Sequence, residues 1–230
     1  IQEKTCNENN FFKPKNLKDL DVLLTHQKSY YERFSSLSLT IKETRPIGFP
    51  MSEELIIREK KIAQGTIECS SFAIKYGISM NIAGGTHHAF YDKGEAFCML
   101  NDQAIAANYL LYNKLVKKIL IIDLDVHQGN GTASIFKKNP NVFTLSFHGE
   151  KNYPFRKENS DLDLGLDDNT NDDYYLKKLK VILPKVIDDF QPEFIFYLAG
   201  VDVLENDKLG RLSMTINGCL QRDQYVLDTC

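Results

Sequence analysis

The sequence lacks the features that mark membrane, secreted and nucleic-acid-binding proteins. None of its apolar runs approaches the roughly 18 residues of a membrane span, and residues 1–8 show no signal-peptide pattern. Its formal net charge is only −3, whereas a general nucleic-acid binder usually carries a basic surface. We therefore expect a protein that binds neither membrane nor nucleic acid directly. Its expected location is the cytoplasm, or also the nucleus if the source is eukaryotic.

Cysteine patterns that build disulfide frameworks or zinc sites are also missing. The five cysteines are odd in number and widely spaced, and no two of them form a Cys-x-x-Cys pair. This spacing favours neither a disulfide framework nor a thiolate zinc site. We expect reduced thiols.

The composition is that of a soluble globule. The chain has 230 residues, of which 43% are apolar and 26% are charged. It contains no internal repeat, low-complexity tract or linker that would separate two domains. We expect one domain over residues 1–230.

Short apolar runs rich in Ile, Val and Phe predict strands that are buried on both faces. These runs cover residues 80–83, 119–124, 142–147 and 194–201. Helical patterns cover residues 52–76, 101–113 and 172–190, and residues 213–215 are expected to cap a last helix that reaches toward residue 230. Gly65 predicts a weak point in the first of these helices, and Pro184 predicts a kink or break in the third. Alternating strands and helices predict an α/β fold, a parallel sheet in three layers with helices on both faces.

Polar residues follow three of the expected strands. Asp125 and His127 follow the second run, Asp202 ends the last, and His87 and His88 follow the first. Because the carboxyl ends of parallel strands meet at one edge of a sheet, we expect these side chains to gather there. One imidazole and two carboxylates can hold a divalent metal and leave positions for water and substrate, while two further imidazoles can move protons at neutral pH. The combination indicates metal-assisted hydrolysis.

The acidic stretch 161–173 has two interpretations. It favours cationic substrates if it lies near the mouth of a site. Alternatively, it is a solvated loop that leads into a helix N-terminus, where acidic residues are stabilising. Three other polar residues are interpreted as structural: His26, His148 and, as a loop anchor, Asp207.

Four sequence blocks resemble, in order and spacing, the zinc-dependent histone deacetylase family. They are Gly-Gly-Thr-His-His-Ala-Phe (84–90), Ala-Phe-Cys-Met-Leu-Asn-Asp (96–102), Asp-Leu-Asp-Val-His-Gln-Gly-Asn-Gly-Thr (123–132) and Ala-Gly-Val-Asp-Val-Leu-Glu-Asn-Asp-Lys-Leu-Gly (199–210). The third block is most similar to the class IV branch, because other branches usually have a second His in place of Gln128 and an Asp in place of Asn130. The resemblance runs from about Leu20 to the C-terminus and implies the arginase/deacetylase-like form of the predicted sheet.

The resemblance implies a Zn²⁺ ion held by Asp125, His127 and Asp202, with a bound water as nucleophile. The ion would lower the pKa of that water and polarise the carbonyl of an acylated lysine. The resemblance also implies a structural K⁺ site. Its ligands would come from the backbone of Asp123, Asp125 and His127 and from Ser146 and Phe147.

The same resemblance assigns proton transfer to a histidine pair. His88 falls at the position of the general base, and His87 looks like its electrostatic partner, with a ring N–H donated to Asp123. Asn130 would face His88 where the family usually has Asp. Because a neutral amide stabilises imidazolium less than a carboxylate does, His88 should be a weaker base and a readier acid.

Two apolar residues match the walls of the family's acyl-lysine channel. Phe97 matches an aromatic wall, and Leu209 matches the residue opposite it. Plain core packing is the alternative for both residues.

The family's transition-state tyrosine, which lies in a Gly-Gly-Tyr segment, has no counterpart in this sequence. Tyr225 lies in a helical run instead, and the opening strand of the family is also missing. The resemblance therefore implies a deacetylase domain without its C-terminal part and its first strand. We expect such a chain to be impaired by a factor of about 10² to 10³, the usual effect of losing one oxyanion donor, unless Tyr153 replaces it.

Three functions remain open. The first is a zinc-dependent amidohydrolase that removes acetyl or other acyl groups from lysine ε-amines of histones or other proteins. The second acts on a small acylated amine such as an acetylpolyamine, and the third is a non-catalytic zinc-containing binding scaffold. An arginase-like site with two manganese ions would need additional Asp and His ligands, which the single Asp-x-His sequence argues against.

Overall fold

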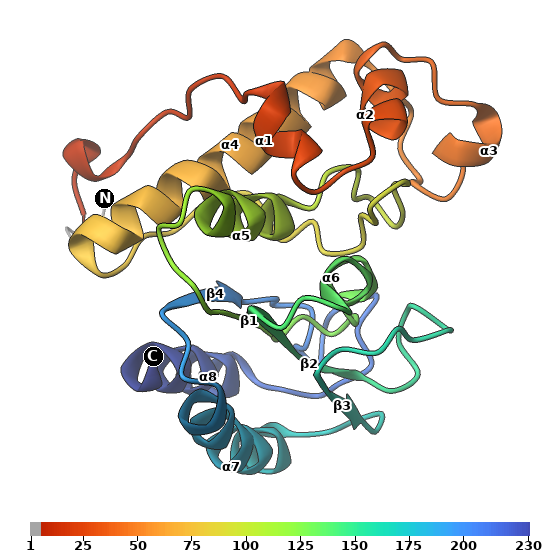
Figure 1. Ribbon diagram of the computed structural model, residues 1–230. Coiled ribbons are helices and arrows are strands. Elements are labelled where there is room, and N and C mark those ends of the chain that lie inside the picture. The colour runs from red at the N-terminus through yellow and green to blue at the C-terminus, as the bar shows by residue number, and fades with distance from the viewer. Residues whose placement is uncertain (1–5) are drawn as a thin grey trace.

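The computed structural model describes residues 6–230, so the first five residues of the segment inspected for a signal peptide lie outside the described part. In this part of the chain the regular elements are helices up to residue 112, and strands and helices are interspersed from residue 119 onward (Figure 1). The helices are η1 (Glu8–Asn10, a 3-10 turn), α1 (Asp19–Leu23), α2 (Lys28–Ser35), α3 (Ile41–Thr44), α4 (Glu53–Tyr76), α5 (Asp102–Tyr112), α6 (Asn130–Phe136), α7 (Asp172–Phe190) and α8 (Ile216–Thr229). The strands are β1 (Ile119–Asp123), β2 (Val142–Gly149), β3 (Leu162–Leu166) and β4 (Phe194–Leu198).

The strands form one parallel sheet in the order β3-β2-β1-β4. β1 is central, and its last residue, Asp123, lies level with Ser146 of β2 and Leu198 of β4. Because the strands run in one direction, the loops that leave their carboxyl ends meet along one edge. The predicted parallel sheet is confirmed.

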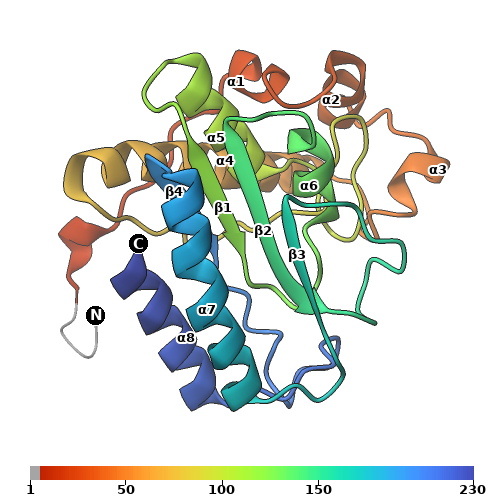
Figure 2. The same ribbon diagram turned by 60° about the horizontal axis from the view of Figure 1, so that its bottom comes forward.

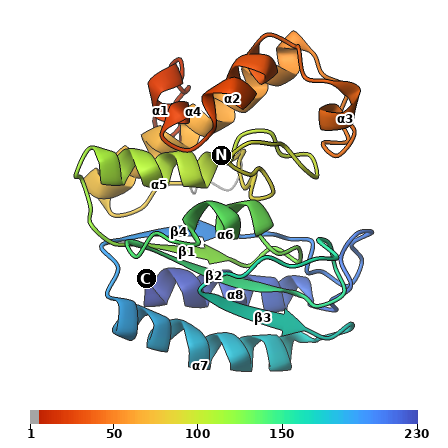
Figure 3. The same ribbon diagram turned by 45° about the vertical axis from the view of Figure 1, so that its right-hand side comes forward.

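Helices cover both faces of this sheet, and the three layers are visible edge-on in Figure 3. α4, α5 and α6 lie on one face, and α7 and α8 lie on the other, in front of the sheet in Figure 2. Alternate residues of β1 enter opposite cores: Ile121 packs in the cluster that includes α4 and α5, whereas Ile122 packs with α7 and α8. All five residues of β1 are therefore buried, which explains why its sequence is a continuous apolar run.

The sequence analysis made two errors about strands: it predicted one strand that does not form, and it missed another. Residues 80–83 form no strand; Met80 and Ile82 are each 80% exposed, so this apolar run packs against nothing that would select an extended pairing. β3 was missed because it lies inside the acidic stretch. It is an edge strand in which partly or fully buried leucines alternate with the exposed Asp163 and Gly165, so it presents no continuous apolar run.

The long helices follow the predicted ranges, but neither expected weak point interrupts them. α4 continues through Gly65, where an added Cβ would lie 3.0 Å from the side-chain nitrogen of Asn81. α7 continues through Pro184, so the expected break was wrong. Pro184 cannot donate an N–H to the carbonyl of Lys180, and the hydroxyl of Tyr225 on α8 donates to that carbonyl instead, at 3.4 Å.

The last helix is present as predicted. α8 begins after Thr215, whose side chain accepts the backbone N–H of Gly218 at 3.0 Å. Within residues 6–230, no helix is both long enough and apolar enough to cross a membrane.

Truncating a side chain between α7 and the sheet should destabilise the protein. Leu179 is fully buried in the core with α8, and we expect Leu179→Ala to lower the free energy of unfolding by about 2–5 kcal/mol. Val181 on the same helix is 67% exposed, so Val181→Ala should change that free energy by no more than about 0.5 kcal/mol. Urea denaturation of both variants measures the difference, and equal effects would contradict this packing.

Candidate active site

The loops after β1 and β4 bring three possible metal ligands together. Ligand atoms of Asp125, His127 and Asp202 all lie within 4.8 Å of one another. Nδ1 of His127 is 3.0 Å from a carboxylate oxygen of Asp125 and 3.0 Å from one of Asp202. All three side chains are half-buried, so an ion there would be partly shielded and still reachable from solvent.

Backbone groups hold both carboxylates of this group in place. The N–H of Val126 donates to Asp202 at 3.0 Å, and the N–H of His127 donates to Asp125 at 2.8 Å. The two loops also touch directly, because a Cβ on Gly200 would lie only 2.5 Å from Cα of Asp125. Only glycine leaves space for this approach.

The electrostatics of the group favour a cation. Burial alone would lower the pKa of His127, but Asp125 and Asp202 outweigh burial and raise it to about 10. Two carboxylates therefore stabilise positive charge at the point where the three side chains meet. One imidazole nitrogen and two carboxylate oxygens are ligands that Zn²⁺, Fe²⁺ and Co²⁺ accept, so the residues fit a divalent metal.

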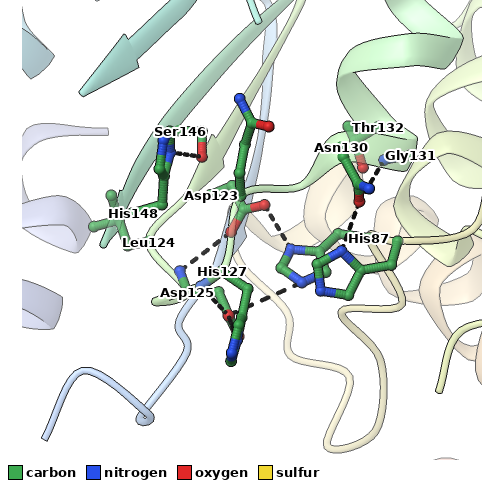
Figure 4. Close-up of polar contacts among 12 residues, drawn as sticks. His87, Asp123, Leu124, Asp125, His127, Asn130, Gly131, Thr132, Ser146 and His148 are labelled. Atoms are coloured by element: carbon green, nitrogen blue, oxygen red, sulfur yellow. Dashed lines mark hydrogen bonds and ion pairs between the residues drawn. The ribbon is translucent and has the colours of Figure 1, made fainter. Parts of the chain in front are cut away.

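The histidine pair lies beside this group, with each ring bonded to a different partner. Nδ1 of His87 is 2.7 Å from Asp123, and Nδ1 of His88 is 2.7 Å from Oδ1 of Asn130 (Figure 4 shows His87 and Asn130). The two ring centroids are 4.1 Å apart, and the His88 ring lies 6.0 Å from that of His127. The structure thus contains both contacts that the resemblance implied.

The segment that carries the pair is not a strand end, contrary to our expectation. Hydrogen bonds to neighbouring elements hold it: Thr86 donates its N–H to Asp102 on α5 at 2.8 Å, and Thr132 on α6 donates its N–H to the carbonyl of His87 at 3.1 Å. The histidines therefore reach the edge of the sheet from the helical layer. Sheet geometry alone does not place them.

Asn130 determines which nitrogen of His88 is a base. The N–H of Gly131 donates to Oδ1 of Asn130 at 3.1 Å, so this oxygen is an acceptor and the Nδ1–H of His88 donates to it. The other ring nitrogen, Nε2, is then unprotonated and can accept a proton.

The two histidines differ in charge at neutral pH: His87 is positive and His88 is neutral. Burial opposes the charge on His87, but Asp123 and Asp125 raise its pKa to about 9. Burial and the neighbouring His87 lower the pKa of His88 to about 2. His88 is therefore a neutral proton acceptor beside a fixed positive charge on His87.

The predicted channel residues are exposed rather than packed in the core. Phe97 is 51% exposed and Leu209 is 65% exposed, so the core-packing alternative is wrong for both. Phe97 adopts a φ of 66°, and its N–H donates to the carbonyl of Ile47 at 2.7 Å. Its ring lies 4.9 Å from that of Phe49, in a loop that the sequence did not single out.

Tyr153 lies closer to the histidine pair than the sequence indicated. Its ring stands edge-on to that of His88, with the centroids 5.1 Å apart, and its hydroxyl donates to the carboxylate of Glu95. The sequence suggested Tyr153 only as a substitute oxyanion donor. One sequence signal could have placed Tyr153 near the site. It is an aromatic residue in the loop after β2, and β2 ends at the same edge of the sheet as β1. Tyr225 lies on α8 with its hydroxyl toward α7, so it does not reach the pair.

Several acids of residues 161–173 have structural partners. Asp163 accepts Gln128 and the N–H of Ser160, and Asp168 pairs with the exposed Arg211. These contacts favour the structural interpretation over attraction of cationic substrates. The residues interpreted as structural have matching contacts: His26 accepts the N–H of Asn101, His148 contacts Ser146, and Asp207 accepts the N–H groups of Leu209 and Gly210.

A three-layer parallel α/β fold with a histidine pair beside an Asp–His–Asp group defines a protein of the arginase–deacetylase architecture. The chain belongs to the histone deacetylase domain family, whose sequence profile matches residues 1–230.

Individual proteins are similar to the chain over most of its length. The chain is 45% identical over 207 residues to an uncharacterized protein of Picosynechococcus sp., covering 90% of the chain and 69% of that protein. It superposes on an HDAC homologue from Aquifex aeolicus with a TM-score of 0.85 and 26% identity, covering 97% of the chain and 66% of the homologue. The structure of an HDAC homologue complexed with SAHA gives a TM-score of 0.84 and 26% identity, with the same coverage. The chain thus spans about two thirds of the length of these relatives.

Introducing a carboxylate beside His88 should raise its pKa. In Asn130→Asp the new charge would face Nδ1 of His88 at hydrogen-bond distance, and an opposite charge this close shifts a pKa by about one unit or more. NMR titration of the His88 ring measures the shift, with Asn113→Asp, at the exposed end of α5, as the control. An unchanged pKa would show that residue 130 does not control the base.

Proposed function

We propose that the chain carries the catalytic centre of a zinc-dependent amidohydrolase that removes acetyl or other acyl groups from lysine ε-amines of histones or other proteins. One observation carries the proposal: a neutral, buried His88 lies next to three converging metal ligands in a member of the histone deacetylase family. A proton acceptor beside a cation site is what hydrolysis of an amide requires.

Asp125, His127 and Asp202 are the proposed metal ligands. Zn²⁺ bound there would lower the pKa of a water molecule and polarise the amide carbonyl. The backbone N–H groups that orient Asp125 and Asp202 support this assignment, because they hold the two carboxylates in place before any ion binds. Fe²⁺ or Co²⁺ would suit the same donors, so the metal found will depend on supply.

His88 is the proposed general base and acid. Its Nε2 would take a proton from the attacking water and then give that proton to the lysine nitrogen as the C–N bond breaks. His87 keeps its charge through Asp123, so it would stabilise the negative oxygen that develops at the carbonyl carbon. Asn130, which is neutral, would hold the ring of His88 without raising its pKa as a carboxylate would.

Phe97, Leu209 and Tyr153 are the proposed walls of the acyl-lysine channel. Each has a large apolar or aromatic side chain, and Tyr153 contacts the His88 ring directly. The structure of an HDAC homologue complexed with SAHA supports a ligand site on this fold.

Contacts of the acidic stretch 161–173 give no support for an acetylpolyamine substrate.

We also infer a class IV-like branch and a structural K⁺ site. Gln128 is fully buried, and its amide bonds Glu158 and Asp163, which supports a structural role for this departure from the family pattern. The K⁺ ligands would be the backbone of Asp123, Asp125 and His127, with Ser146 and Phe147. Ser146 lies level with Asp123 on the neighbouring strand, which supports this set.

Removing one metal ligand should remove the metal. We expect near-stoichiometric zinc in the parent protein and a content well below that in Asp202→Ala, measured by elemental analysis. Asp207→Ala is a matched control, because Asp207 bonds only its own loop in the described structure. Full zinc retention by Asp202→Ala would refute the ligand set.

Removing the proposed base should abolish turnover without removing the metal. His88→Ala should lower hydrolysis of an acetyl-lysine peptide by about 10² or more while zinc content and SAHA binding stay at parental values. Turnover within a few-fold of the parent would refute the role of His88. A parent protein that binds zinc and SAHA but hydrolyses nothing would favour the binding scaffold.

A further inference from the structure

Arg222 on α8 has the largest side chain among the fully buried residues, and nothing in its sequence context marked it as functional. α8 lies against the sheet on the side opposite α4 and α5 (Figure 3). Nη1 of Arg222 donates to the carbonyl of Gly200 at 2.7 Å and to the carbonyl of Leu124 at 3.2 Å. One side chain therefore bonds the segments that follow both β1 and β4.

The two carbonyls lie next to proposed metal ligands. Leu124 immediately precedes Asp125, and Gly200 lies two residues before Asp202. Two other hydrogen bonds join the same segments: the N–H of Leu124 donates to the carbonyl of Leu198, and that of Val126 donates to Asp202, each at 3.0 Å. The hydrogen bonds of Arg222 differ from these two, because they come from a helix outside the sheet and not from the two segments themselves.

The guanidinium is itself held in a fixed orientation. Its Nε donates to Asp223 at 2.8 Å, and the same oxygen of Asp223 accepts the hydroxyl of Tyr197 on β4 at 2.5 Å. Arginine suits this place because its donors form a rigid planar fork and its charge does not titrate. A buried charge is costly even where Nε and Nη1 are bonded, because Nη2 is buried with no hydrogen-bond partner in the described part of the chain, so a position that needs only packing would not favour arginine.

We propose that Arg222 is a positioning residue that fixes the spacing of the β1 and β4 loops and, through it, the spacing of Asp125 and Asp202. The inference rests on the proposed function, because it concerns the affinity of that site for a divalent cation. Without the guanidinium, the two loops would sample a wider range of separations. Binding an ion would then require ordering them first, and metal affinity would fall.

The experiment compares metal affinity among variants of the 230-residue chain. Zn²⁺ or Co²⁺ dissociation constants are measured by competition with a chromophoric chelator for the parent, Arg222→Met, Arg222→Lys and Leu179→Ala. Arg222→Met keeps a long apolar side chain but has no donor, and we expect about 10- to 100-fold weaker metal binding, as for other residues that orient metal ligands. Arg222→Lys should bind with intermediate affinity, because one ammonium can donate to a carbonyl but lacks the rigid fork.

Leu179→Ala separates positioning from general stability. Leu179 packs in the same core, and its apolar side chain makes no hydrogen bond, so its truncation should destabilise the protein without removing a hydrogen bond to either loop, and its metal affinity should equal that of the parent. Thermal unfolding with and without metal shows that each variant is folded. Should Arg222→Met fail to fold, the comparison of Arg222→Lys with Leu179→Ala decides the question.

Three results would overturn the inference. These are parental metal affinity in Arg222→Met, parental affinity in Arg222→Lys when Arg222→Met does not fold, and an equal loss of affinity in Leu179→Ala. A parent protein that binds no divalent ion would instead refute the proposed function, and the inference with it.

Discussion

The parallel pairing of β1 with β4 is the constraint on which the candidate site depends. The register aligns Asp123 with Leu198, so the loops that follow these residues leave the sheet side by side. Asp125 and Asp202 are far apart in the sequence, and only this pairing brings them within reach of one ion. The narrow gap between the loops also explains Gly200, because any side chain there would collide with Asp125. A change in this register would separate the ligands even if each residue were kept.

The sequence predicted the parts of the fold whose burial is uniform. β1 is buried on both faces, so its run of apolar residues was sufficient to locate it. β3 is an edge strand with one buried and one exposed face, and its Asp163 resembled a loop acid. Residues 80–83 show the opposite case, because an apolar run without a neighbour to pair with forms no strand. Packing against neighbouring elements decided whether these two segments form strands, and a local sequence pattern carries no information about that packing.

The candidate site was accessible from the sequence only where residues lie in motifs. The Asp-x-His sequence and the adjacent histidines were visible as motifs, and the resemblance supplied the partners of the histidines. Tyr153 was suggested by its place in a loop rather than by a motif, and Arg222 was not indicated at all. Tyr153 reaches His88 through the conformation of a loop, and Arg222 contacts backbone carbonyls, which carry no residue-specific signal. Contacts of this kind follow from packing and leave no characteristic spacing in the chain.

The amide at position 130 has a consequence for how many protons the site exchanges. A carboxylate bonded to an imidazole forms a coupled pair, whose two protonation steps belong to the pair rather than to either group. Asn130 does not ionise, and the neighbouring His87 keeps its proton until about pH 9. The hydrogen bond between Asn130 and His88 therefore contains one titrating group, whereas the contact between His87 and Asp123 joins two. An amide at position 130 removes one ionisable group from the contact that holds the base.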